Sequence, residues 1–162
     1  MKPIKLHYSE ALVRRAVKAF WFRVTGWRFF IAMAVLVVFL IYFVTTGDRS
    51  WLVGVSGSVF TLGLVFAIAL YFVHRRASLA RFHRMRSPEA TFEPGEQSFR
   101  ITSDVGTTDL AWGTITEVWR FTEFWLVFFS RAQFITLPVA DLDSEAREFI
   151  LSRFKSNGIK VV

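Results

Sequence analysis

Two long runs of uncharged, mostly apolar residues dominate the first half of the chain. Nineteen uncharged residues separate Arg28 from Asp48, and 24 separate Arg49 from His74. A helix rises about 1.5 Å per residue and the hydrocarbon core of a bilayer is about 30 Å thick, so each run is long enough to cross it. The pattern therefore predicts a two-helix transmembrane hairpin over residues 29–74.

A third apolar stretch, TEFWLVFFSRAQFITLPVADLD at residues 122–143, is interrupted by charge. Its uncharged parts are 7 and 9 residues long, and Arg131 lies between them. A spanning helix needs about 20 apolar residues, and a central arginine would be costly in lipid. The stretch is rich in aromatic and β-branched residues at strand length. We therefore predict a buried hairpin of two strands.

The residues around this hairpin show further strand and helix signals. Phe99 and Ile101 alternate with polar neighbours, turn residues occur at 94–95 and 103–106, and Gly113 separates two more apolar segments. Five short strands at this spacing are typical of an antiparallel meander. The last segment predicts a helix that is capped by Asp143 or Ser144, buries one apolar face, and stops at Asn157 and Gly158. That face is formed by Ala146, Phe149, Ile150 and Phe154. Residues 91–162 are thus expected to form an α+β domain, a curved antiparallel sheet closed by a C-terminal helix.

The segment before the hairpin, residues 1–28, carries two patterns. Ile4, Leu6 and Tyr8 alternate with polar residues and predict a strand, which could return to pair with the later sheet. Residues 9–24 then predict a basic amphipathic helix. Such a helix either lies along the lipid headgroups or simply extends the first crossing. Residues 75–90 form a basic connector after the second crossing.

The formal net charge of +7 is unevenly divided along the chain. Residues 1–88 contain 13 Lys/Arg and two acids, whereas residues 89–162 contain seven Lys/Arg and 11 acids. Nucleic-acid binding is disfavoured because the expected folded domain is acidic. Basic residues flank the two runs and are rare near Gly47, so we expect both termini on the cytoplasmic side. We expect a collar of bases to contact membrane lipids. Its members are Arg14, Arg15, Lys18, Arg23, Arg28, Arg75, Arg76 and Arg81.

A set of spaced residues in the second half resembles a known family. Trp112, Ile115 and Val118 form a W-x-x-I-x-x-V stretch, and Leu137 and Pro138 end a strand segment before the last helix. With the two-helix hairpin, this arrangement is similar to the YcxB-like family of bacterial membrane proteins. The resemblance implies a pleckstrin-homology-like (PH-like) β domain and a bacterial inner-membrane location, and it brings no catalytic residues.

Catalytic, metal and cofactor sites are not indicated by the sequence. The chain has no cysteine, which removes thiolate ligands and thiol nucleophiles. His74 and His83 lie nine residues apart in a basic segment, with no carboxylate at ligand spacing. The acids at 104 and 109, and at 141, 143, 145 and 148, are explained by turns and a helix start. We therefore expect a protein that is not an enzyme and binds no cofactor; an enzyme acting on lipid would depend on the two histidines.

Small residues recur at four-residue spacing in the second apolar run. The pairs are Gly54 with Ser58 and Gly63 with Ala67. Such spacings let helices approach closely, either within one hairpin or between two copies of the chain in a homo-oligomer.

Aromatic residues exceed what one face of a small sheet requires, so part of them could form a partner surface. The candidates are Trp119, Phe121, Phe124 and Trp125. Two functions remain open: a membrane-anchored module whose β domain binds or senses a protein partner, and an immunity protein that neutralises a toxin acting at the membrane.

Overall fold

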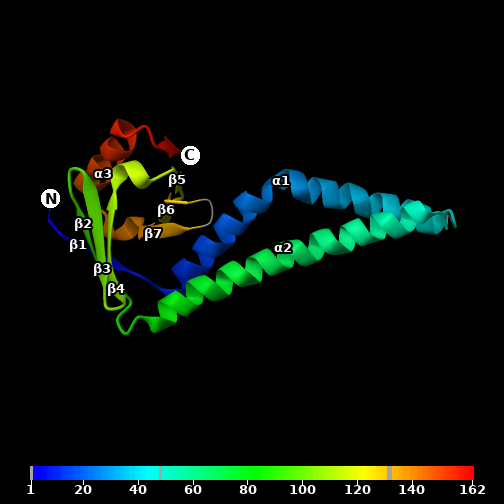
Figure 1. Ribbon diagram of the computed structural model, residues 1–162, viewed down its shortest axis with the longest axis horizontal. Coiled ribbons are helices and arrows are strands. Elements are labelled where there is room, and N and C mark those ends of the chain that lie inside the picture. The colour runs from blue at the N-terminus through cyan, green and yellow to red at the C-terminus, as the bar shows by residue number, and fades with distance from the viewer. Residues whose placement is uncertain (1, 48, 131–132) are drawn as a thin grey trace. The chain divides into compact units, whose positions relative to one another are not determined.

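The computed structural model describes residues 2–47, 49–130 and 133–162, and the chain divides into two compact units (Figure 1). Val17–Ser78 is called here the helical unit, and Met1–Ala16 with Leu79–Val162 the sheet unit. Each unit is described by itself.

The helical unit consists of most of two long helices. The first residues of one helix and the last residues of the other belong to the sheet unit. The two helices are α1, Glu10–Thr45, and α2, Trp51–Arg84. α1 is broken at Gly26, whose φ of 71° and ψ of 150° are not helical, and its axis changes direction there (Figure 1). Glycine tolerates this backbone because it has no Cβ. The predicted amphipathic helix and the first apolar run therefore both belong to α1, and the kink at Gly26 lies between them.

Both helices are long and apolar enough to cross a membrane. Almost none of their apolar windows is buried within the protein. α2 also continues through most of the segment expected to be a connector, ending at Arg84. Asp48, at the predicted outer turn, lies outside the described residues.

The sheet unit contains two four-stranded sheets. The first has the order β1-β2-β3-β4, all antiparallel neighbours: Ile4–His7, Glu89–Pro94, Ser98–Ser103 and Gly106–Ala111. The second has the order β7-β6-β5-β8: Phe134–Pro138, Phe124–Phe128, Glu117–Arg120 and Lys160–Val161. The possibility that the N-terminal strand pairs with the later sheet is thereby confirmed.

The expectation of one curved sheet is wrong, because β4 and β5 do not pair. Between them the short helix η1, Trp112–Thr114, turns the chain from one sheet to the other. The Trp112 ring is 1% exposed, and its indole nitrogen donates a hydrogen bond to the Gly95 carbonyl at 3.0 Å. Burial of this large ring draws the turn inward and ends the first sheet at β4.

The predicted hairpin over residues 122–143 is confirmed as β6 and β7, which pair antiparallel from Phe124 opposite Pro138 to Phe128 opposite Phe134. Arg131, in its polar break, lies outside the described residues. A second short helix, η2 (Val139–Asp141), follows β7. β8 adds a two-residue strand that the sequence did not predict, and it pairs parallel with β5.

The C-terminal helix α3, Ser144–Ser156, packs on the core shared by the two sheets. Asp143 is its N-cap, and a carboxylate oxygen accepts a hydrogen bond from the Ala146 amide at 2.7 Å. Gly158, at φ 68°, follows the last turn, as the sequence predicts. The buried core contains Leu6, Phe92, Phe99, Trp112, Ile115, Val118, Trp125, Val127, Leu137, Leu142, Ala146, Ile150, Phe154 and Ile159.

Candidate functional site

Three of the four aromatic side chains expected at a partner surface are buried. Trp119 is 9% exposed, Phe124 4% and Trp125 3%, whereas Phe121 is partly exposed. All five residues of β6 are buried, so this strand does not present one face to solvent. The aromatic excess is thus mainly core, and the four positions together offer Phe121 and one edge of Trp125 to a partner.

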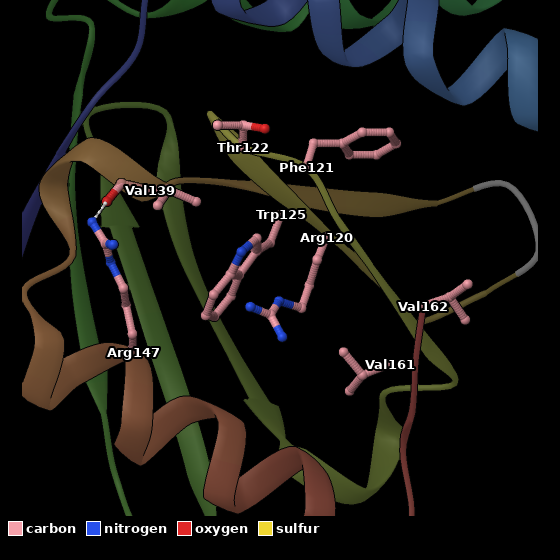
Figure 2. A pocket seen from close by; sticks show the side chains of 8 residues that line it. All are labelled: Arg120, Phe121, Thr122, Trp125, Val139, Arg147, Val161 and Val162. Carbon is pink, nitrogen blue, oxygen red and sulfur yellow. Dashed lines mark hydrogen bonds between the residues drawn. The ribbon is translucent and has the colours of Figure 1, made fainter.

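That edge forms part of an open hollow of about 440 Å³ in the sheet unit, called here the Arg120 pocket (Figure 2). The ends of β5 and β6, the turn between them, η2, α3 and β8 all contribute to it. Its lining residues are Arg120, Phe121, Thr122, Trp125, Val139, Arg147, Val161 and Val162. The tight turn at the rim is held by a 2.9 Å hydrogen bond from the Phe121 amide to the Phe124 carbonyl.

Two arginines give the pocket its charge, and they differ in their contacts. The Arg147 guanidinium donates to the carbonyl oxygens of Leu142 at 2.8 Å and Val139 at 2.7 Å, the latter bond being drawn in Figure 2. The Arg120 guanidinium instead lies over the Trp125 ring, 5.5 Å from its centroid. Within the described ranges, no carboxylate forms an ion pair with Arg120. The two hydrogen bonds therefore hold the Arg147 guanidinium in place, whereas the Arg120 guanidinium is available to bind an anionic group.

A second hollow of about 530 Å³, called here the His7 pocket, adjoins the first. Thr122, Val139 and Arg147 line both, so the two hollows are neighbours, together called here the depression. The other residues of the His7 pocket are His7, Ser9, Leu12, Arg15, Glu123, Pro138, Ala140 and Asp141.

Two residues that line the His7 pocket, His7 of β1 and Asp141 of η2, are joined by polar contacts. The His7 amide donates to one Asp141 carboxylate oxygen at 2.6 Å, and the His7 Nδ1 lies 3.0 Å from the other. The next residue, Tyr8, donates its hydroxyl to the Thr136 carbonyl at 2.9 Å. Burial of the Tyr8 phenol, and secondly the negative charge of Asp141, raise the pKa of Tyr8. These contacts tie the first strand to the end of β7.

Four of the six acids considered as possible catalytic pairs, Asp104, Asp109, Asp141 and Asp143, have structural partners. Asp104 accepts hydrogen bonds from the backbone amides of Arg86 and Ser87, Asp109 pairs with Arg100, and Asp143 caps α3. Among the residues that the structure describes, no cluster of three or more His, Asp or Glu could hold a metal ion. His74 and His83 are not brought together with any of these acids: His74 lies against Phe20 and His83 against Phe82.

The residues of the predicted basic collar differ in their contacts and exposure. Arg14 pairs with Glu10 on its own helix, and Arg15 pairs with Glu123 at 2.9 Å and lines the His7 pocket. Lys18 lies over the Phe22 ring, 5.8 Å from its centroid. The described side chains of Arg23, Arg28, Arg76 and Arg81 are exposed, and Arg75 is partly exposed. The role of Arg15 could not be found from sequence because Glu123 is more than 100 positions away.

The two small-residue pairs of α2 differ in their distance from α1. A methyl group added to Gly63 would lie 3.1 Å from Sδ of Met33 on α1, and the Ala67 carbonyl accepts a 2.8 Å hydrogen bond from the Trp21 indole. At Gly54 an added methyl group would meet no described atom within 4 Å. The Ser58 hydroxyl donates back to the Gly54 carbonyl at 2.8 Å. Gly63 and Ala67 thus lie where α1 and α2 approach, whereas Gly54 and Ser58 do not.

The fold and these pockets define a protein class: a two-helix unit able to cross a membrane by length and composition, joined to a two-sheet α+β unit with an open, basic and aromatic depression. A family model described as YcxB-like protein matches residues 94–152, from the end of β2 into α3. The match supports the resemblance to that family within the sheet unit and includes Trp112, Ile115, Val118, Leu137 and Pro138. No curated protein and no solved structure matches the chain.

Proposed function

We propose that this protein is a non-enzymatic interaction module anchored in the bacterial inner membrane. Its helical unit is the anchor, and its sheet unit, a PH-like domain, binds a protein partner at the cytoplasmic surface. The observation that carries the proposal is the Arg120 pocket, where an arginine without a carboxylate partner in the described chain covers a buried tryptophan.

The anchor is supported by the apolar surface of the two helices. Many large side chains along them are half exposed or more, such as Val35 at 50%, Phe39 at 53% and Leu62 at 69%. Each Å² of apolar surface left in water costs about 25 cal/mol, so this surface requires a nonpolar environment. Lipid provides one along the apolar runs of both helices.

The cytoplasmic position of the sheet unit is supported by the bias of Lys and Arg toward the cytoplasmic side of membranes. Seven bases precede the first apolar run and five closely follow the second, whereas the connecting turn contains only Arg49. A helical hairpin returns the chain to the side from which it entered. The two parts of the sheet unit, Met1–Ala16 before the hairpin and Leu79–Val162 after it, would then lie in the cytoplasm.

The chemistry of the depression fits an acidic segment of a protein with one apolar or aromatic side chain. Arg120 would bind a carboxylate of the partner, with bidentate geometry available from its guanidinium. Phe121, Trp125, Val161 and Val162 supply apolar surface beside that charge. Arginine and aromatic residues are the side chains that dominate binding free energy at protein interfaces.

The test is affinity purification of the intact protein in mild detergent from its native host, followed by mass spectrometry. Two variants are compared with the parent: Arg120→Ala with Phe121→Ala, and the matched control Arg100→Ala. Arg100 is also an exposed strand arginine, but it lies on β3 and pairs with Asp109 at 2.9 Å. Near-ultraviolet circular dichroism of each variant checks that the tryptophan core is intact.

The expected result is a stoichiometric protein partner that is lost, by about tenfold or more, from the Arg120 and Phe121 variant and kept by the control. A toxin as that partner would select the immunity role. Equal recovery of the partner with both variants would overturn the assignment of the pocket.

A further inference from the structure

The helical unit contains a hollow of its own, which the proposed function leaves unassigned. It has a volume of about 350 Å³ and is called here the Lys18 groove. α1 contributes Lys18, Trp21 and Phe22, and α2 contributes Ile68, Tyr71 and Phe72. Both sets follow the i, i+3, i+4 spacing of one helix face, so the groove is formed by two facing helical stripes.

The walls of the groove are held in place by contacts between the helices. The Trp21 indole donates to the Ala67 carbonyl at 2.8 Å, and its ring meets the Tyr71 ring edge to face at 5.8 Å. On α1, Trp21 also contacts Phe30 at 5.7 Å across the break at Gly26. The groove is thus a built feature at the kink.

The position of the groove along α2 indicates how deep in the membrane the groove lies. Tyr71 follows Trp51 by 20 residues, which is about 30 Å of helix and about the thickness of a hydrocarbon core. With Trp51 at one membrane surface, Tyr71 and Trp21 lie at the other. Tryptophan and tyrosine are enriched at both surfaces, where one end of the ring is apolar and the other is wet.

The charged residues of α1 and α2 at this depth are all basic. Lys18 is the charged residue that lines the groove, and the next bases of α2, Arg75 and Arg76, lie outside its lining. No acid occurs in α2, and Glu10 is the acid of α1, two turns before Lys18 and paired with Arg14. An occupant must therefore be anionic on the wet side and apolar on the other.

We propose that the Lys18 groove binds one anionic phospholipid of the cytoplasmic leaflet. Lys18 binds the phosphate, and an acyl chain lies along Phe22, Ile68 and Phe72, which are 49%, 47% and 45% exposed. This inference rests on the membrane anchor of the proposed function and is independent of the Arg120 pocket. A free phosphate compound would leave these apolar walls uncovered, so the acyl chain is required.

The experiment is native mass spectrometry of the intact protein, purified in mild detergent and mixed with phosphatidylglycerol or phosphatidylcholine of matched chains. Lys18→Gln is compared with Arg76→Gln, an exposed base of α2 that does not line the groove. Phe72→Ala reports on the acyl chain, and Lys18→Arg restores the charge. Glycerol 3-phosphate is added as a headgroup without chains.

The expected result is one phosphatidylglycerol per protein, retained at least tenfold better than phosphatidylcholine. Retention falls about tenfold in Lys18→Gln and clearly in Phe72→Ala, returns in Lys18→Arg, and is unchanged in Arg76→Gln. Equal loss in Lys18→Gln and Arg76→Gln would overturn the inference, since it would mean diffuse attraction by all the bases. Displacement of the lipid by glycerol 3-phosphate would also overturn it.

Failure of the anchor itself is detected separately. Carbonate extraction of membranes from the same cells reports whether the protein is integral to the membrane. A protein that resists extraction but shows no preference between the two lipids refutes the groove and leaves the anchor standing. A protein released by carbonate refutes the anchor, and the lipid inference with it.

Discussion

Tyr8 links the two sheets by a single side chain. It follows β1, and its hydroxyl donates to Thr136 of β7 at 2.9 Å. The neutral phenol is favoured because the group is buried and lies near Asp141, so its pKa is raised. A tyrosine in an unfolded chain loses its proton near pH 10. The folded state therefore gains stability from neutral Tyr8 below about pH 10 and loses it as the pH rises toward the folded pKa.

Tyr8→Phe is expected to change stability in a pH-dependent way. At pH 8 the variant loses one hydrogen bond, which lowers the free energy of unfolding by about 1 kcal/mol. Between pH 10 and 11 the parent loses stability that the variant does not, so the difference between them shrinks. Urea unfolding in mild detergent at both pH values, followed by circular dichroism, measures this. A difference that stays constant from pH 8 to 11 would contradict the assignment; Tyr42→Phe is the control.

Single residues also show where sequence reasoning was insufficient. The aromatic and β-branched content of residues 122–143 identifies a strand hairpin, but it does not say that β6 is covered on both faces. Burial on both faces depends on segments distant in sequence. The Arg120 pocket was missed for a related reason. Its charged walls, Arg120 and Arg147, come from a strand and a helix that meet only in the fold.

The helix α3 shows how a local signal fixes the boundary of an element. Asp143 satisfies an amide of the first turn, and removing such a cap costs about 1 kcal/mol. Asp143→Ala is expected to lower the free energy of unfolding of the sheet unit by that amount. Ser144→Ala is the control, because Ser144 is exposed and its neighbour is the cap. Chemical denaturation monitored by tryptophan fluorescence compares the two; equal effects would argue against the cap.

Contact between α1 and α2 is tested at two glycines of α2. Gly63→Leu would place side-chain atoms against Met33, and overpacking costs about 1–3 kcal/mol. A Cβ atom added at Gly54 meets no described atom within 4 Å, and Gly54→Leu gains about 0.8 kcal/mol of helix propensity. We expect the thermal unfolding midpoint in detergent to fall for Gly63→Leu and to stay or rise for Gly54→Leu. A matching fall in both variants would refute the approach at Gly63.

Elements differed in how well the sequence predicted them. The two apolar helices, the β6–β7 hairpin and α3 have strong local signals: length, β-branched and aromatic content, and caps. β8 has two residues and is formed only because the chain after Gly158 returns beside β5. The separation into two sheets depends on burial of Trp112 among residues from both sheets and α3. No local pattern contains that information.

At the scale of the whole molecule, the division of charge and the division into units coincide in part. The acids of the second half belong to the sheet unit, where Glu123, Glu89 and Asp141 contact residues of the N-terminal segment. Arg15, Lys5 and His7 are their partners. The first residues of the chain thus serve the fold of the sheet unit, and the proposed contact with the membrane surface would fall to the exposed bases of the helices.

The topology can be tested directly because the chain contains no cysteine. Single cysteines replace Thr46, which directly follows α1 at the start of the turn, and Asn157 after α3, both exposed. In intact cells of a bacterium with a permeabilised outer membrane, a membrane-impermeant maleimide is expected to label Thr46→Cys and to spare Asn157→Cys until the inner membrane is broken. This follows because a hairpin of two crossings separates the turn from both flanks. Labelling of Asn157→Cys in intact cells would place the Arg120 pocket outside the cytoplasm, and a cytoplasmic partner would then be excluded.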